Sequence, residues 1–123
     1  MTAIDMETQE VLWERPIGTA RNGGPFGWML GVDIEIGMPL NGGSLVTGSG
    51  LTFFAGSQDG YFRAMSTETG EELWRVDLPT GATATPMSYL GAESGEQFIA
   101  VTAGGTFQTT ERGDYIIAYR LPR

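Results

Sequence analysis

Residues 64–74 of the chain read AMSTETGEELW, and they repeat residues 3–13, which read AIDMETQEVLW. The two segments align without gaps, with six of eleven positions identical and an offset of 61 residues. Each copy is typical of a strand, a tight turn and a second strand, because Gly70 can supply the positive φ of such a turn. The first copy has Gln9 at that position, so we expect its turn to be looser.

Further β-rich runs complete the unit around the second copy. We predict its four strands at residues 44–47, 51–55, 61–66 and 72–77. A third cycle follows, with predicted strands at residues 84–89, 97–102 and 114–120. Four short strands repeated about every 50–60 residues are typical of a propeller blade. The sequence therefore predicts an all-β fold made of about two four-stranded antiparallel blades of a β-propeller.

The repeat divides the chain into four expected parts. Residues 1–16 form the end of a preceding blade, residues 17–43 a long inter-blade loop, residues 44–79 a complete blade, and residues 80–123 a final blade without its fourth strand. Because a propeller closes with roughly 4–8 blades, we expect the other blades to lie outside this stretch. Each repeated Trp is expected to pack between neighbouring blades, Trp74 within this stretch and Trp13 mostly against residues upstream of it.

Composition excludes several kinds of site. The 123 residues include no His, no Cys and no Lys, which removes Ser-His-Asp and Cys-His nucleophiles, thiolate or imidazole zinc sites and Schiff-base lysines. A formal net charge of −8 argues against a nucleic-acid partner. No export signal and no apolar run of about 20 residues is visible, so we expect no membrane segment in this chain. Carboxylates, hydroxyls, amides and Arg remain, and they suit a hard cation or an anionic cofactor.

The repeated pattern at residues 64–74, Ala-x-x-x-x-Thr-Gly-x-x-x-Trp, resembles the tryptophan-docking motif of dehydrogenases that use pyrroloquinoline quinone (PQQ). Three further segments are similar to the C-terminal portion of the membrane-bound glucose and quinate dehydrogenase branch of that family. They are residues 41–43 (NGG), 78–87 (LPTGATATPM) and 113–122 (GDYIIAYRLP).

This resemblance implies a parent enzyme with an eight-bladed propeller, PQQ and Ca²⁺ on its axis, a sugar, polyol or alcohol as substrate, and ubiquinone as electron acceptor. It also implies a periplasmic location for that parent. In the family, an Asp near the calcium removes the proton of the substrate hydroxyl, and its position lies upstream of the matched residues. We therefore assign no catalytic residue and no metal ligand in this chain, and expect it to be inactive without the remaining blades.

The same resemblance suggests site residues. Asn41, with Gly42 and Gly43, is expected beside the quinone, where its side chain can bond a PQQ oxygen and the glycines allow close approach. Thr106 follows two glycines where several sugar-oxidising relatives have His, so we expect it to contact substrate, and Trp28 is a candidate aromatic wall. The ordinary alternatives are a strand-entry turn for Asn-Gly, a plain loop residue for Thr106 and surface packing for Trp28.

Two other readings of the repeats stay open. A non-catalytic propeller module for protein interaction would have the same repeats, but would not need the segments at residues 41–43 and 104–105. Several copies of the chain could also assemble into one ring, which light scattering would detect. Separately, Asp33 and Glu35 alternate with apolar residues, and this alternation predicts an edge strand at residues 32–36 with a solvated face.

Overall fold

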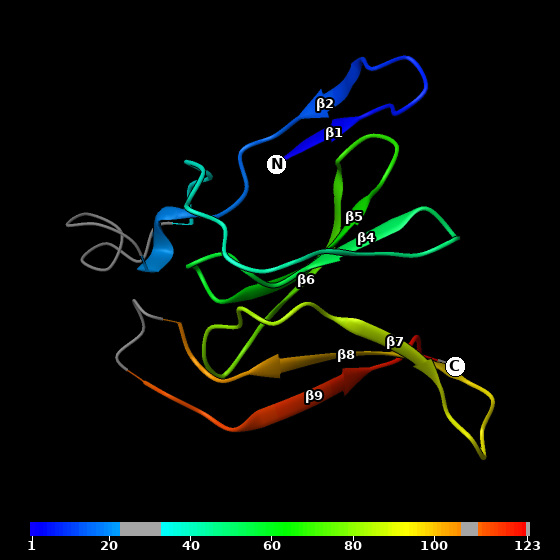
Figure 1. Ribbon diagram of the computed structural model, residues 1–123. Coiled ribbons are helices and arrows are strands. Elements are labelled where there is room, and N and C mark those ends of the chain that lie inside the picture. The colour runs from blue at the N-terminus through cyan, green and yellow to red at the C-terminus, as the bar shows by residue number, and fades with distance from the viewer. Residues whose placement is uncertain (23–32, 107–110, 123) are drawn as a thin grey trace.

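The computed structural model describes residues 1–22, 33–106 and 111–122 (Figure 1). These residues contain nine strands and one short 3-10 helix. They are β1 (Thr2–Ile4), β2 (Val11–Glu14), η1 (Ala20–Asn22), β3 (Leu45–Val46), β4 (Leu51–Phe54), β5 (Tyr61–Ser66), β6 (Glu72–Asp77), β7 (Met87–Leu90), β8 (Gln97–Ala103) and β9 (Tyr115–Tyr119).

The strands form three antiparallel sheets, one after another along the chain and side by side in Figure 1. The first sheet contains β1 and β2, the second β3 to β6, and the third β7 to β9, each in the order of the sequence. The prediction of an all-β, antiparallel structure is therefore confirmed.

Most predicted strands match the structure closely. β5 and β6 have the predicted bounds, whereas β7 begins at Met87 rather than at Ala84, directly after Pro86, which has no N–H to donate. The edge strand predicted over residues 32–36 is wrong in its described part, where Glu35 forms only an isolated bridge with Thr19. Asp33 is drawn instead toward Arg75, with which it forms an ion pair of 2.7 Å.

The second sheet has a hydrophobic core on each of its faces. Toward the third sheet, Phe62 of β5 is fully buried and packs with Val101 and Ala103 of β8. Toward the first sheet, Phe54 and Met65 are buried with Ile17. Burying one such side chain contributes about 1.5–3 kcal/mol, so the alternation of apolar residues along β4 and β5 holds all three sheets together.

The sequence suggested that the turn at Gln9 is looser than the turn at Gly70, and this prediction is wrong. Gln9 has a φ of 60°, close to the 67° of Gly70. The hydrogen bond from Gln9 N to Asp5 O and that from Gly70 N to Ser66 O are both 2.8 Å long. The side chain of Asp5 also accepts the N–H of Glu7 at 2.7 Å, and this bond helps hold a non-glycine residue in the left-handed region.

Trp13 packs against residues downstream of it, so the expectation of an upstream partner is wrong. Its indole Nε1 donates to the carbonyl of Thr67 at 2.9 Å, and a Cβ added to Gly70 would lie 2.6 Å from the ring. Trp74, as predicted, finds partners within the chain, with ring centroids 5.8 Å from Phe62 and 5.4 Å from Tyr119. The first repeat therefore docks on the turn of the second.

We predict that Gly70→Ala lowers the free energy of unfolding by about 1–2 kcal/mol for the left-handed backbone and by about 1–3 kcal/mol more for the clash with Trp13. Urea denaturation measures the loss. Gly95→Ala is the matched control, because Gly95 has a φ of 65° and open space around it. Equal losses in the two variants would contradict a packing role for Gly70.

Candidate functional site

The long connections of the three sheets meet at one end of the molecule, on the side of Figure 1 where η1 lies. Asn41 N donates to Gly56 O at 2.8 Å, and Leu40 pairs with Ser57, which joins the inter-blade loop to the β4–β5 connection. Gly105 N donates to Gly81 O at 2.8 Å and joins the β8–β9 connection to the β6–β7 connection. We call this the loop end.

The described members of the predicted site all belong to the loop end. Asn41, Gly42 and Gly43 lie just before β3, and Thr106 lies just after β8. Trp28 is outside the described residues, so its predicted role stays a prediction.

Gly42 and Gly43 have a structural requirement within the chain itself. Gly42 has a φ of 117°, and a Cβ there would meet Thr83 O at 2.5 Å. A Cβ on Gly43 would collide with Thr85 Oγ1. Both glycines therefore let the segment before β3 lie against the β6–β7 connection, which is a different reason from the approach of a quinone suggested above.

Asn41 has a fixed backbone and an available side chain. Its N–H is bonded to Gly56, and its carbonyl lies where a Cβ on Gly56 would be. Among the residues that the structure describes, its half-buried side-chain amide has no hydrogen bond. The amide can therefore donate to and accept from a ligand at the loop end.

Thr106 is only 8% exposed and has an interaction partner in the protein. Only a small part of its surface is open to a substrate. The predicted substrate contact stays a prediction.

A buried ion pair at the loop end was missed by sequence reasoning. Arg63 and Asp59 have side chains 1% and 0% exposed, and Arg63 Nη2 lies 2.5 Å from Asp59 Oδ2. Arg63 also donates to Ser57 Oγ at 2.7 Å and to Glu72 Oε2 at 2.8 Å, while Asp59 accepts the N–H of Thr19 at 2.7 Å. An Arg between apolar residues of a predicted strand, four positions after an Asp, was the available signal.

Burial and hydrogen bonding act in opposite directions on these two groups. Burial alone would raise the pKa of Asp59, but the hydrogen bonds from Arg63 and Ser57 outweigh it and hold that pKa below the ordinary value of 3.8. Burial would likewise lower the pKa of Arg63, and the carboxylates of Asp59 and Glu72 raise it instead. Both groups are therefore charged at neutral pH.

Two buried polar atoms, on the residue that donates to Asp59 and on the residue before Asp59, have no hydrogen-bond partner among the described residues. They are Oγ1 of Thr19 and Nε2 of Gln58. Leaving such a group unsatisfied costs about 1–3 kcal/mol, so each is expected to bind an ordered water or a polar group of a ligand. Gln58 directly precedes Asp59 in the β4–β5 connection.

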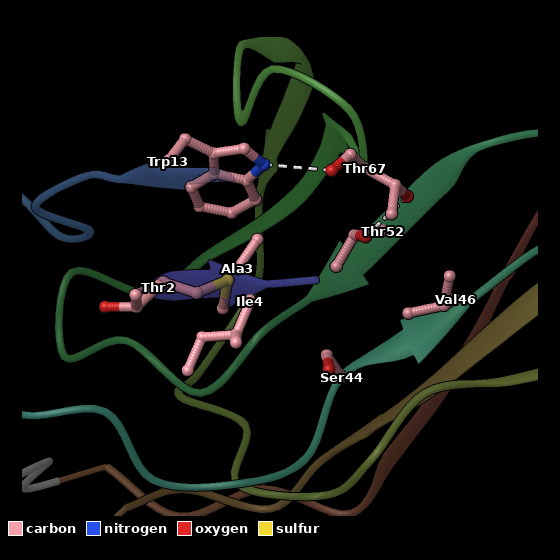
Figure 2. Close-up of a pocket in the computed structure, with 9 residues that line it drawn as sticks. Thr2, Ala3, Ile4, Trp13, Ser44, Val46, Thr52 and Thr67 are labelled. Carbon is pink, nitrogen blue, oxygen red and sulfur yellow. Dashed lines mark hydrogen bonds between the residues drawn. The ribbon is translucent and has the colours of Figure 1, made fainter. Parts of the chain in front are cut away.

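A pocket lies away from the loop end, between the first and second sheets (Figure 2). Ile4 and Val46 line it, and the indole of Trp13 lies beside it with its hydrogen bond to Thr67 drawn as a dashed line. None of its nine lining residues has an ionisable side chain. This pocket offers packing surface rather than acid–base chemistry.

Residues 1–22, 33–106 and 111–122 contain neither a candidate metal cluster nor a membrane-spanning helix. There, no three carboxylates come together as a metal site. No helix in that part of the chain is long and apolar enough to cross a membrane.

Comparison with known proteins places these features in a family. Residues 1–99 match the PQQ family of glucose/ethanol/alcohol dehydrogenase β-propeller domains. The whole chain is 48% identical over 123 residues to quinate/shikimate dehydrogenase (quinone) of Acinetobacter baylyi, and 99% of it is 41% identical to quinoprotein glucose dehydrogenase of Escherichia coli. The chain spans 15% of the length of each of these relatives.

The fold is also found in a solved structure. Quinohemoprotein alcohol dehydrogenase from Comamonas testosteroni matches 99% of this chain and 17% of its own chain, with a TM-score of 0.64 and 24% sequence identity. This likeness confirms the predicted fold class, antiparallel β-sheets of a propeller. The number of blades in the complete ring stays a prediction.

We predict that Asp59→Asn lowers the free energy of unfolding by about 3–5 kcal/mol, because it leaves the buried guanidinium of Arg63 with Glu72 as its remaining carboxylate partner. Urea denaturation measures the loss. Asp77→Asn is the control, since it breaks the exposed pair with Arg21, which is worth about 0–1 kcal/mol. Similar losses in both variants would contradict a special role for the buried pair.

We also predict that the stability difference between the natural protein and Asp59→Asn depends on pH. The pKa of Asp59 is lower in the folded than in the unfolded state. The contribution of Asp59 to the free energy of unfolding is therefore complete above pH 3.8, and it is lost as the pH falls through the folded-state pKa. The stability gap between the natural protein and Asp59→Asn should thus stay constant from about pH 7 to about pH 5 and narrow below about pH 4. A gap that already narrows above pH 5 would be inconsistent with the lowered pKa.

Proposed function

Because the chain belongs to the PQQ family of glucose/ethanol/alcohol dehydrogenase β-propellers, we propose that it forms part of a quinone-linked dehydrogenase that oxidises a sugar, a polyol or an alcohol. The observation that carries this proposal is similarity over the whole chain to relatives whose names are quinate/shikimate dehydrogenase (quinone) and quinoprotein glucose dehydrogenase.

PQQ, when bound, supplies the two-electron acceptor that such an oxidation needs. The cofactor is rich in anionic oxygens, so a fitting site must present hydrogen-bond donors. Among the described residues of the loop end, the half-buried side-chain amide of Asn41 is such a donor, and Nε2 of Gln58 is a buried donor without a partner. The residues present thus fit the cofactor, and Asn41 is proposed to hold one of its oxygens while Gly42 and Gly43 keep the backbone in place.

The remaining functions are proposed to reside outside this chain. We assign the general base and the Ca²⁺ ligands to other blades of the parent enzyme, so the chain is proposed to be inactive alone. Ubiquinone is the proposed electron acceptor and the periplasm the proposed location. Thr106 and Trp28 are proposed substrate contacts, the first from the β8–β9 connection and the second from the inter-blade loop.

The comparisons do not favour a non-catalytic interaction module. The similarity to dehydrogenases extends over the loop segments as well as over the strands, since 99–100% of the chain is aligned.

We predict that the purified chain, mixed with PQQ and Ca²⁺, shows no reduction of a redox dye with glucose, quinate or glycerol. The physical reason is that a general base in hydrogen-bond reach of the substrate is required, and we assign none to these residues. The assay is dye reduction followed by absorbance, with a complete quinoprotein dehydrogenase as positive control. Turnover by the chain alone would contradict its proposed inactivity.

In the complete enzyme, Asn41→Ala is predicted to weaken PQQ binding up to about tenfold, the effect of losing one hydrogen bond. Quenching of Trp fluorescence on titrating the apoenzyme with PQQ gives the dissociation constant. Gln97→Ala is the control, because its amide donates to Ser88 at 2.8 Å in the β7–β8 pair and not at the loop end. An unchanged dissociation constant for Asn41→Ala would remove Asn41 from the cofactor site.

A further inference from the structure

The described ends of the inter-blade loop pair with each other. Ala20 N donates to Ile34 O at 2.9 Å, and Met38 N donates to Ile17 O at 2.9 Å. We call these paired residues, 17–20 and 34–38, the stem. Its second side continues through Leu40 to Asn41, three positions after Met38, where the backbone N–H is also bonded to Gly56 O.

The side chain of Tyr61, the first residue of β5, is surrounded by cations. The guanidinium carbons of Arg75, Arg21 and Arg63 lie 4.6, 5.0 and 5.2 Å from the centre of its ring. The chain has only seven basic residues, so three of them meet at one aromatic side chain. Guanidinium groups at this distance are attracted by the negative face of the ring.

Two ion pairs cross between the loop and β6 beside this ring, and they run in opposite senses. Arg21, from the loop, pairs with Asp77 of β6 at 2.8 Å. Asp33, from the other side of the loop, pairs with Arg75 of β6 at 2.7 Å. We call Tyr61 with these four charged residues the Tyr61 clamp. Each side of the loop is thus tied to the sheet by its own ion pair, and both pairs share one ring.

The clamp lies outside the buried ion pair and is linked to it through Glu72, which pairs with both Arg63 and Arg75. Arg21 and Arg75 are 34% and 38% exposed, whereas Arg63 is 1% exposed. The buried layer holds the stem through the bond from Thr19 N to Asp59 and through the packing of Ile17 with Phe54 and Met65. Substitution of the outer residues can therefore loosen the stem without opening the core.

We propose that the Tyr61 clamp positions Asn41 for the cofactor by fixing the stem on the second sheet. This inference rests on the proposed role of Asn41 as a PQQ contact. Tyr61, Arg21, Arg75 and Asp33 are positioning residues in this scheme, since they act on the cofactor through the stem and not by touching it.

The test uses the complete enzyme and four variants. Tyr61→Leu removes the aromatic ring, and Arg75→Gln removes one cation over the ring together with the ion pairs to Asp33 and, at 3.6 Å, to Glu72. Tyr61→Phe keeps the ring and removes the hydroxyl, which contacts Asp33 at 3.4 Å and also interacts with Arg21. Arg120→Gln is the matched control, because it breaks an ion pair of similar exposure with Glu96 on the third sheet.

Two properties are measured for each variant. Hydrogen exchange at the backbone N–H groups of Ala20 and Met38 in the apoenzyme reports how firmly the stem is held. The dissociation constant of PQQ, from fluorescence quenching, reports the position of Asn41. Tyr61→Leu and Arg75→Gln should each speed exchange about fivefold and weaken PQQ by a similar factor, the effect of one lost cation–π or ion-pair contact. Tyr61→Phe and Arg120→Gln should leave both properties unchanged.

Each contrary outcome refutes a different step. Unchanged exchange in both Tyr61→Leu and Arg75→Gln would overturn the clamp. Faster exchange with an unchanged dissociation constant would overturn its transmission to Asn41, provided that Asn41→Ala itself weakens PQQ. If Asn41→Ala has no effect, the proposed cofactor contact fails, whatever the exchange rates show. Loss of affinity in Tyr61→Phe as well would overturn the assignment to the ring.

Discussion

The carboxylate of Asp59 is fully buried, and its hydrogen bonds join three segments of the chain. It accepts from the guanidinium of Arg63 on β5, from the hydroxyl of Ser57 in the same connection, and from the N–H of Thr19 in the inter-blade loop. A buried charge without partners would cost several kcal/mol. Asp59 can therefore be buried only where β5, the β4–β5 connection and the inter-blade loop come together. The position of the inter-blade loop on the second sheet follows from this requirement, and the loop end is built around it.

The two ends of the sheets have different characters. At the end opposite the loop end, the turns at residues 5–10, 66–71 and 91–96 are closed by hydrogen bonds of 2.8–2.9 Å in the same pattern. One of these turns receives the indole of Trp13. At the loop end the connections are long, differ from one another and contain the half-buried Asn41 and the unpartnered Nε2 of Gln58. The regular turns thus stabilise the sheets, whereas the irregular connections can present binding groups.

The repeated strands and turns indicate the family, whereas the irregular connections contain the candidate site residues. Strands, turns and Trp docking recur along the chain, and the similarity to quinoprotein dehydrogenases covers all of it. A cofactor site on a propeller axis is shared among blades, and this chain spans 15% of the length of its relatives. Asn41 and Gln58 are therefore proposed as one part of a site, with other segments of the parent enzyme supplying the rest.

The repeat of residues 3–13 in residues 64–74 by itself predicted the pairs β1–β2 and β5–β6 and the turns between them. Its tryptophan-docking pattern also indicated the family. These features are local, since alternation and turn chemistry act over a few residues. Asn41, Gly42, Gly43 and Thr106 could be named only through a resemblance, because their residue types are equally common in ordinary loops.

Tertiary structure alone decided which distant groups several residues contact. Gly42 is needed against Thr83, and Trp13 docks on Gly70. Arg63 is buried because it forms an ion pair with Asp59. Asp33 is not part of the predicted strand and forms an ion pair with Arg75. Several of these contacts join residues about 40 or more positions apart, and a pattern in neighbouring residues carries no information about which distant group will be there.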